Sequence, residues 1–202
     1  MKKSINIKFI IFDAYGVILK GGYPQTCEAL GKKFNRDWNE IYEILYKKYF
    51  NMAATRKITQ KDAWVLAIKE LELPIDWKEA RDIHYGFMGV NNDVAKFINT
   101  IDKNIPTLLL SKNTRSQFSD AEKLFGFKKY FTHVINTWEL GIPKASKKTM
   151  RYITKKFKAR PEEIIYIDDQ KENLVDAKEM GVNTIFFESF AQFKNEFNNY
   201  LK

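Results

Sequence analysis

The chain reads Phe9-Ile10-Ile11-Phe12-Asp13-Ala14-Tyr15-Gly16-Val17 near its amino terminus. Its first four residues form an apolar run that is typical of a strand buried on both faces of a parallel sheet. The run stops at Asp13, and a carboxylate without a partner is costly to bury at such a point. In open α/β sheets, functional groups gather beyond the carboxyl ends of the strands. The stretch therefore predicts an α/β fold and a functional role for Asp13.

Five short apolar segments have the character of strands, and helical patterns separate the last four of them. The expected strands are residues 7–12, 107–110, 133–136, 164–167 and 183–187. Helices are expected over residues 115–125, 146–157 and 171–180, because their apolar residues recur at helical spacing. Strands that alternate with helices indicate a doubly wound parallel sheet.

The stretch from 21 to 90 departs from this alternation and contains no convincing strand. Three helical segments are expected there: residues 26–53, a helix that the capping sequence Thr59-Gln60-Lys61-Asp62 opens and that runs through Leu71, and a helix from Asp76 to about Met88. This insertion is longer than a simple crossover between strands. We therefore expect a small all-helical cap, residues 21–90, inserted into an α/β core formed by residues 1–20 and 91–202.

Composition excludes several classes of protein. Hydrophobic residues make up 45% of the 202 residues and aromatic residues 15%, which indicates a globular rather than a disordered chain. No apolar run approaches the roughly 20 residues that cross a bilayer, so we expect no membrane association. The single cysteine, Cys27, excludes an intramolecular disulfide framework and favours a cytoplasmic location.

The formal net charge of +9 raises the question of nucleic-acid binding. The basic residues are scattered as doublets, such as Lys32-Lys33 and Lys155-Lys156, rather than gathered in one tract. Doublets on helices are typical of solvated faces, so the charge argues against a nucleic-acid partner. A positive field favours small anionic substrates instead. The sequence carries no signal for an oligomeric state.

Polar residues lie just beyond four of the expected strands. They are Asp13, then Ser111-Lys112-Asn113, then Lys144, then Asp168-Asp169. Each alone has an ordinary explanation as a cap, a turn residue or a solvated side chain. The carboxyl ends of parallel strands meet at one edge of a sheet, and we therefore expect these groups to lie together.

Together these residues suit phosphoryl transfer. Asp13 can take up a phosphoryl group as an aspartyl-phosphate. Asp168 and Asp169 offer the hard oxygen ligands that Mg²⁺ prefers, and the metal would screen Asp13 from an incoming phosphate dianion. Ser111 and the amides after it can bind phosphoryl oxygens, while Lys144 supplies a fixed positive charge.

These four motifs resemble, in order and place, those of the haloacid dehalogenase-like (HAD) superfamily. The family's first motif is hhhhDxDx(T/V), where h is apolar, and residues 9–17 are similar to it. The other three are similar to Leu110-Ser111-Lys112-Asn113, to Gly141-Ile142-Pro143-Lys144, and to Ile167-Asp168-Asp169 with Asn173. The resemblance extends from about Ile7 to Phe187, and the helical insertion matches the family's C1-type cap position. It implies a Rossmann-like core and a hydrolase, most often a phosphoric monoester hydrolase.

The resemblance also implies a role for each motif residue. Asp13 would be the nucleophile and a magnesium ligand, and Ser111 and Lys144 would hold the phosphoryl group. The other metal ligands would be Asp168, Asp169 and the backbone carbonyl of Tyr15. The residues assigned to substrate and phosphate binding are Tyr15, Gly16, Lys112 and Asn113. Asn173 would support a metal-bound water or a neighbouring ligand.

Tyr15 departs from the pattern of HAD phosphatases, which carry a second aspartate there as general acid and base. A tyrosine, with an ordinary pKa of about 10, is a poor replacement at neutral pH. Losing general acid catalysis typically costs about two to four orders of magnitude in rate. Phosphates with good leaving groups would suffer less.

Three functions therefore stay open. The leading one is a Mg²⁺-dependent phosphatase or phosphotransferase that acts on a small phosphorylated metabolite. The second is a catalytically weakened HAD domain that binds a phosphorylated ligand or partner. The third is a 2-haloacid dehalogenase, because those enzymes also carry Asp-x-Tyr-Gly. They need no metal, however, and they hold halide with an arginine shortly after the first motif. The pair Asp168-Asp169 and the lack of any arginine before Arg36 argue against this third function.

Overall fold

The structure is a computed structural model of the chain and describes residues 6–200. The chain forms two compact units. The first, which we call the core unit, contains the chain up to Leu19, Val90–Lys112 and the chain from Phe127 onward. The second, the helical unit, contains Lys20–Gly89 and Asn113–Gly126. Within residues 6–200, no helix combines the length and the apolar character needed to span a membrane.

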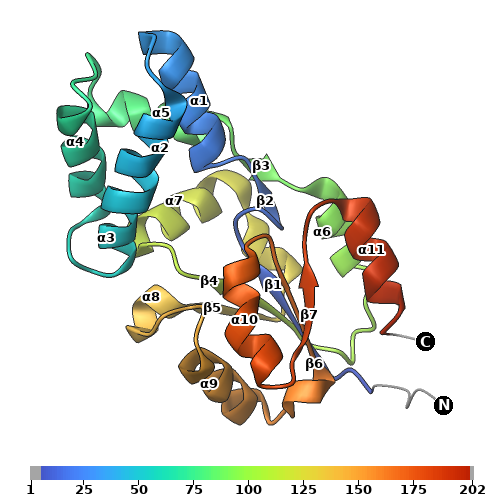
Figure 1. Cartoon of the computed structure of the whole chain (residues 1–202). Helices are drawn as coiled ribbons and strands as arrows, with labels where there is room; N and C mark the ends of the chain where they lie inside the picture. The colour runs from blue at the N-terminus through green and yellow to red at the C-terminus, as the bar shows by residue number, and fades with distance from the viewer. Residues whose placement is uncertain (1–5, 201–202) are drawn as a thin grey trace. The chain divides into compact units, whose positions relative to one another are not determined.

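The core unit is built on a parallel sheet with the strand order β5-β4-β1-β6-β7 (Figure 1). The strands are β1 (Phe9–Asp13), β4 (Thr107–Ser111), β5 (His133–Asn136), β6 (Ile164–Asp168) and β7 (Asn183–Phe186). All five expected strands are confirmed, with ends that differ by at most two residues. Asp13, Ser111 and Asp168 are therefore the last residues of their strands. The chain extends the sheet first to one side of β1 and then to the other, which confirms the doubly wound α/β fold.

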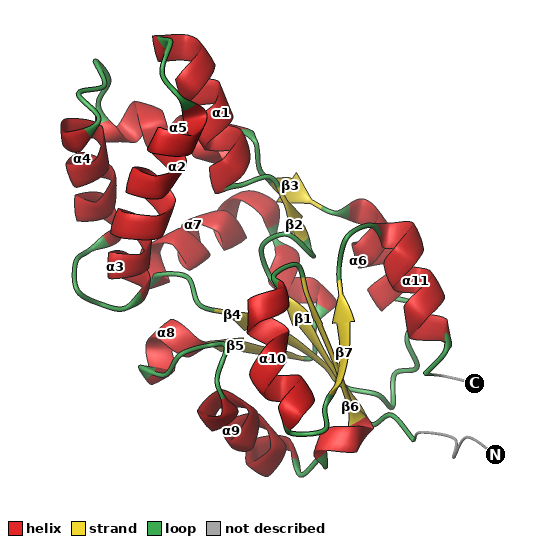
Figure 2. Ribbon diagram, viewed as in Figure 1, coloured by secondary structure: helices red, strands yellow, loops and turns green. Residues whose placement is uncertain are grey.

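Helices of the core unit cover both faces of this sheet (Figure 2). They are α6 (Asn92–Ile98), α8 (Thr137–Leu140), α9 (Lys147–Phe157), α10 (Lys171–Glu179) and α11 (Phe190–Asn198), with the 3-10 turns η2 (Phe127–Tyr130) and η3 (Pro161–Glu163). Alternate side chains of a strand point to opposite faces. Phe9 and Tyr166 pack in one apolar cluster with residues of α9 and α10. Phe12 meets Phe193 of α11 on the other face, with ring centroids 6.2 Å apart.

The helical unit has an aromatic interior. Its elements are α1 (Tyr23–Phe34), α2 (Trp38–Tyr42), the π-helix η1 (Glu43–Phe50), α3 (Asn51–Ala54), α4 (Gln60–Glu70), α5 (Trp77–Gly86) and α7 (Arg115–Phe125). The ring of Tyr23 lies 4.7 Å from Phe50 and 5.8 Å from Trp64, measured between centroids. Burying several large rings in one small unit contributes to its hydrophobic stabilisation, together with the aliphatic residues of the same cluster.

The expected single helix over 26–53 is wrong, because the chain breaks after α1. Asn35 adopts the left-handed conformation at φ 51° and ends α1, and asparagine tolerates this region better than most residues. The side chain of Asp37 then accepts a hydrogen bond from the Asn39 amide and starts α2. The capping box of Thr59 and Asp62 is present as expected.

Two further details differ from the expected organisation. A pair of two-residue strands, β2 (Leu19–Lys20) and β3 (Gly89–Val90), forms where the chain leaves and re-enters the core unit, so Gly89 is in a strand that the sequence did not reveal. In addition, α7 packs in the helical unit, although the predicted core included all of residues 91–202. The hydroxyl of Thr114, which caps α7, donates to Gln60 of α4 at 2.9 Å.

A buried histidine links three helices of this unit. Nδ1 of His84 lies 2.9 Å from the hydroxyl of Thr26, and Nε2 lies 3.3 Å from the amide nitrogen of Gln117. The Thr26 hydroxyl donates its one hydrogen bond to the carbonyl of Gly22 at 2.7 Å. It must therefore accept from Nδ1–H of His84, which leaves Nε2 to accept from Gln117. Burial lowers the pKa of His84 to about 3.

We expect this histidine to make the protein less stable in acid. The unfolded chain takes up a proton near pH 6.5 and the folded chain only near pH 3, so stability is lost as the pH falls through this window. One proton corresponds to about 1.4 kcal/mol of unfolding free energy per pH unit. His84→Gln should flatten this slope in urea unfolding measured from pH 7 to pH 4. An unchanged slope in His84→Gln would contradict the assignment.

Candidate active site

The carboxyl ends of β1, β4 and β6 bring three predicted site residues to one edge of the core sheet. Asp13, Ser111 and Asp168 end these strands, and their exposed fractions are 5%, 0% and 0%. The central strand β1 pairs with β4 on one side and with β6 on the other, with Asp13 opposite Leu110. Asp13 therefore has a functional strand end on either side. Polar groups that are buried to this extent need partners.

Lys144 supplies the main partner. Its Nζ lies 2.5 Å from Oδ1 of Asp13 and 2.8 Å from Oδ2 of Asp168. The side chain is almost wholly buried. The segment that carries it is fixed by the carbonyl of Pro143, which accepts hydrogen bonds from the hydroxyls of Ser146 and Thr149. The side chain of Lys144 therefore reaches the site even though Pro143 directly precedes it.

Asp168 has all of its carboxylate positions occupied. Oδ1 accepts from the amide of Gln170 and from Nδ2 of Asn173, each at 2.9 Å. Oδ2 accepts from the hydroxyl of Tyr166 at 2.6 Å and from Lys144. Burial, the largest single influence, would raise the pKa of Asp168, but the charge of Lys144 together with the hydrogen bonds from Lys144, Tyr166 and Asn173 lowers it. Asp168 is thus an ionised group held in place by four donors.

Asp169 is arranged differently. Its Oδ1 is buried and, among the residues that the structure describes, has no hydrogen-bond partner. Gly16 approaches it closely, since a Cβ atom on Gly16 would lie only 2.0 Å from Oδ2 of Asp169. Gly16 also has φ +90°, a conformation that strongly favours glycine. An orphaned carboxylate oxygen inside a protein implies a missing partner such as a cation.

Three carboxylates share the site with one ammonium group, that of Lys144. Burial, followed by the charge of Asp168, raises the pKa of Asp13 well above its ordinary value. The same two causes raise the pKa of Asp169 to about 6. Burial would lower the pKa of Lys144, but Asp13 and Asp168 outweigh it and raise that pKa. One oxygen from each of the three carboxylates lies within 4.8 Å of the others, which is a spacing that suits a shared metal ion.

The other predicted residues differ in how the structure places them. Lys112 follows Ser111 and feels the site electrostatically: burial first, and then the charge of Lys144, lowers its pKa. Tyr15 is half-buried and pairs with Leu19 through an isolated bridge. Asn173 contacts Asp168 directly. Asn113 belongs to the helical unit, so its role in phosphate binding stays a prediction.

Tyr166 also belongs to the candidate site, although none of the sequence motifs includes it. It is fully buried, and its hydroxyl is bound to Asp168. The signal was a tyrosine in an otherwise aliphatic strand, two residues before an aspartate. Residues two apart in a strand share a face, so the side chains of Tyr166 and Asp168 must point to the same side of the sheet.

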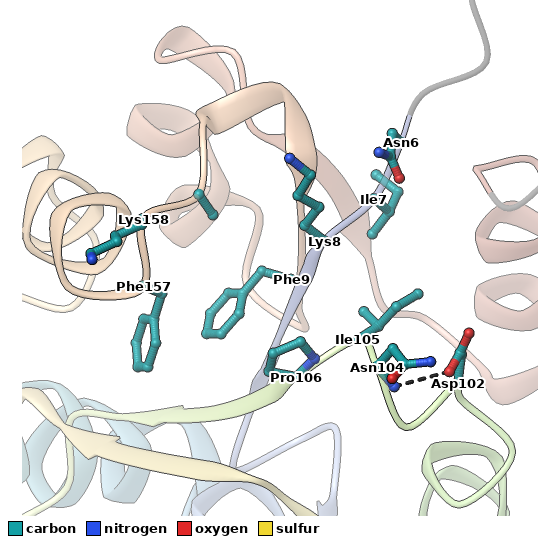
Figure 3. A pocket seen from close by; sticks show the side chains of 11 residues that line it. Asn6, Ile7, Lys8, Phe9, Asp102, Asn104, Ile105, Pro106, Phe157 and Lys158 are labelled. Atoms are coloured by element: carbon teal, nitrogen blue, oxygen red, sulfur yellow. Dashed lines mark hydrogen bonds between the residues drawn. The ribbon is translucent and has the colours of Figure 1, made fainter.

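A cavity of about 510 Å³ lies elsewhere in the core unit (Figure 3). It is lined by residues that include Phe9, at the amino end of β1, as well as Pro106, Phe157 and Lys158. It contains none of the predicted site residues, so the carboxylate cluster remains the candidate active site.

The close approach of Gly16 to Asp169 gives a testable requirement. Gly16→Ala should displace the Asp169 carboxylate and weaken Mg²⁺ binding at least about tenfold, measured by isothermal titration calorimetry. It should also lower the unfolding free energy by about 1–3 kcal/mol through backbone strain. Gly181→Ala is the matched control, because Gly181 has φ +89° and its Cβ would meet nothing closer than 3.9 Å. The control should lose stability but keep its Mg²⁺ affinity. Equal Mg²⁺ affinity in both variants would refute the requirement.

Comparison with known proteins agrees with this architecture. A family model described as haloacid dehalogenase-like hydrolase matches residues 7–181. No curated protein is similar enough in sequence to count as a relative.

Several solved structures share the fold. A HAD family enzyme from Bacteroides thetaiotaomicron superposes with a TM-score of 0.77 at 16% identity, over 95% of this chain and 98% of that one. Its wild-type complex with magnesium and inorganic phosphate gives a TM-score of 0.72 at 18% identity, over 89% and 93% of the chains. The L-2-haloacid dehalogenase from Xanthobacter autotrophicus gives 0.67 at 16% identity, over 95% and 82%. The family model spans most of the sequence and includes all four motifs, and the chain therefore belongs to the haloacid dehalogenase-like hydrolases.

Proposed function

We propose that the protein is a magnesium-dependent phosphatase or phosphotransferase that acts on a small phosphorylated metabolite. One observation carries the proposal. The carboxylates of Asp13, Asp168 and Asp169 come together at the strand ends, and the ammonium group of Lys144 lies between two of them. In this arrangement Asp13 and Asp169 can hold a divalent cation while Lys144 offers a positive charge to a phosphate. The magnesium and inorganic phosphate bound to the similar B. thetaiotaomicron enzyme support this class of chemistry.

The residues at the site fit a magnesium ion. Asp169 has a buried oxygen that lacks a partner among the described residues, and carboxylate oxygen is the ligand that Mg²⁺ prefers. We assign Asp13, Asp169 and the backbone carbonyl of Tyr15 as the protein ligands. Asp168 has both oxygens engaged by donors of the chain, and we assign it to holding Lys144 instead. When bound, the ion would screen the negative charges of nucleophile and phosphate from one another.

The side chains then divide the reaction between them. A carboxylate oxygen of Asp13 attacks phosphorus in line with the leaving oxygen, which departs with the electron pair of the broken P–O bond. Lys144 and Ser111 hold the non-bridging oxygens as charge develops on them. Water, or an acceptor alcohol in the case of transfer, next attacks the phosphorus of the aspartyl-phosphate and gives up its proton to solvent. The P–O bond to Asp13 breaks, and its electron pair restores the Asp13 carboxylate. No carboxylic acid stands at position 15 to protonate the leaving oxygen, so substrates with good leaving groups should react best.

The basic test is Mg²⁺-dependent phosphate release from p-nitrophenyl phosphate and acetyl phosphate. Asp13→Asn should lower the rate at least about a thousandfold, because it removes the nucleophile. Asp82→Asn, at a surface carboxylate that is 66% exposed, should leave the rate unchanged. Failure of the wild type to turn over any activated phosphate would rule out the proposed function.

Restoring the acid should reveal how much it contributes. We expect Tyr15→Asp to raise kcat on phosphates with poor leaving groups by about tenfold or more, and to change kcat on p-nitrophenyl phosphate much less. Tyr15→Asn is the matched control, since asparagine has nearly the same shape as aspartate but cannot act as a general acid. Equal gains in both variants would show that side-chain size, and not acid catalysis, limits the rate.

Two other functions have specific support. Tyr15 and the structural likeness to L-2-haloacid dehalogenase favour displacement of halide by Asp13. Chloride release from 2-chloropropionate in the presence of EDTA would establish it, and we expect none. The lack of a carboxylic acid at position 15 favours the other alternative, a domain that binds phosphate without turnover. It would bind Mg²⁺ and inorganic phosphate in calorimetry without turning over any substrate.

A further inference from the structure

We infer that Tyr166 is a positioning residue that acts through Asp168 to hold Lys144 beside the nucleophile. The inference rests on the proposed function and adds a residue that no motif contains. Tyr166 lies between Ile165 and Ile167 in a fully buried strand. Burying a phenol hydroxyl in such a place costs free energy unless a partner accepts its hydrogen bond. That partner is Oδ2 of Asp168, at 2.6 Å.

The geometry around Asp168 shows what the hydroxyl does. A carboxylate has about four lone-pair directions, and those of Asp168 are filled by Gln170, Asn173, Tyr166 and Lys144. On Oδ2, the Tyr166 hydroxyl fills one position and thereby leaves Lys144 the other. The carboxylate cannot turn without losing several bonds in a dry interior, where each bond is expensive to lose.

The position left to Lys144 is the one that also reaches Asp13. Its Nζ makes a contact of 2.8 Å with Asp168 and one of 2.5 Å with Asp13, so the two carboxylates share it. Without the Tyr166 hydroxyl, Oδ2 of Asp168 would have an empty direction and no second donor. It would then attract Lys144 more strongly, away from Asp13 and from the phosphoryl group that Asp13 receives. A free direction would also let Asp168 turn toward a cation.

Tyr166→Phe removes the hydroxyl and little else. We expect kcat/KM for p-nitrophenyl phosphate to fall about tenfold, and the affinity for inorganic phosphate in the presence of Mg²⁺ to fall about fivefold in calorimetry. Tyr152→Phe is the control, since its hydroxyl accepts a hydrogen bond from the exposed Lys156 of the same helix. It should change neither quantity. A fall of less than twofold in both quantities for Tyr166→Phe would overturn the inference.

A double-mutant cycle separates positioning from a general loss of structure. If Tyr166 acts through Lys144, Tyr166→Phe should cost less than twofold in a Lys144→Met background. If its role is only structural, the same factor should appear in both backgrounds, and the inference fails. If Lys144→Met abolishes turnover, the same comparison can be made with the affinity for inorganic phosphate, measured in both backgrounds.

A crystal structure of Tyr166→Phe gives a readout that does not depend on activity. The distance from Nζ of Lys144 to the Asp13 carboxylate should lengthen beyond hydrogen-bonding range, roughly 3.5 Å. An unmoved lysine would contradict the inference even for an inactive protein. A wild type without turnover would defeat the proposed function, whereas an active wild type with an unaffected Tyr166→Phe would defeat only this inference.

Discussion

The buried ammonium group of Lys144, shared by Asp13 and Asp168, is the interaction on which the site depends. Carboxylates that end neighbouring strands of a parallel sheet are forced close together, and in a dry interior they repel one another strongly. One lysine compensates two of them. Removing one partner of such a buried pair typically costs about 3–5 kcal/mol, because the remaining charge is left uncompensated. Among residues 6–200, nothing donates to Oδ1 of the third carboxylate, Asp169, which makes the site receptive to a cation.

Much of the fold could be predicted from sequence because its strands are short apolar runs with unambiguous ends. The five core strands and the capping box at Thr59 follow from local rules. The break after α1 does not, since a helical apolar stripe continues across Asn35 and only the left-handed turn there reveals the end of the helix. The packing of α7 with α4 and α5 depends on contacts of Thr114 and Gln117 with residues far away in the sequence, which no periodicity reports.

The site shows the same division between local and non-local information. Strand order sufficed to predict that Asp13 and Asp168 would lie side by side, because they end neighbouring parallel strands, and Lys144 contacts both of them. The motifs did not distinguish Asp168 from its neighbour Asp169. The structure does, since four donors surround the first and a glycine opens space beside the second. Adjacent residues at a strand end point in different directions, so their partners depend on the tertiary fold.

In the proposed reaction, Asp13 receives a phosphoryl group. Because position 15 lacks the carboxylate that would activate water, the aspartyl-phosphate should form faster than it breaks down and should accumulate. Acid quenching after incubation with acetyl phosphate and Mg²⁺, followed by peptide mass spectrometry, measures this directly. We expect one added phosphoryl group on the peptide that contains Asp13, and none when EDTA replaces Mg²⁺. Phosphate release in the absence of any phosphoryl group on Asp13, or a phosphoryl group found on another residue, would contradict the proposed reaction.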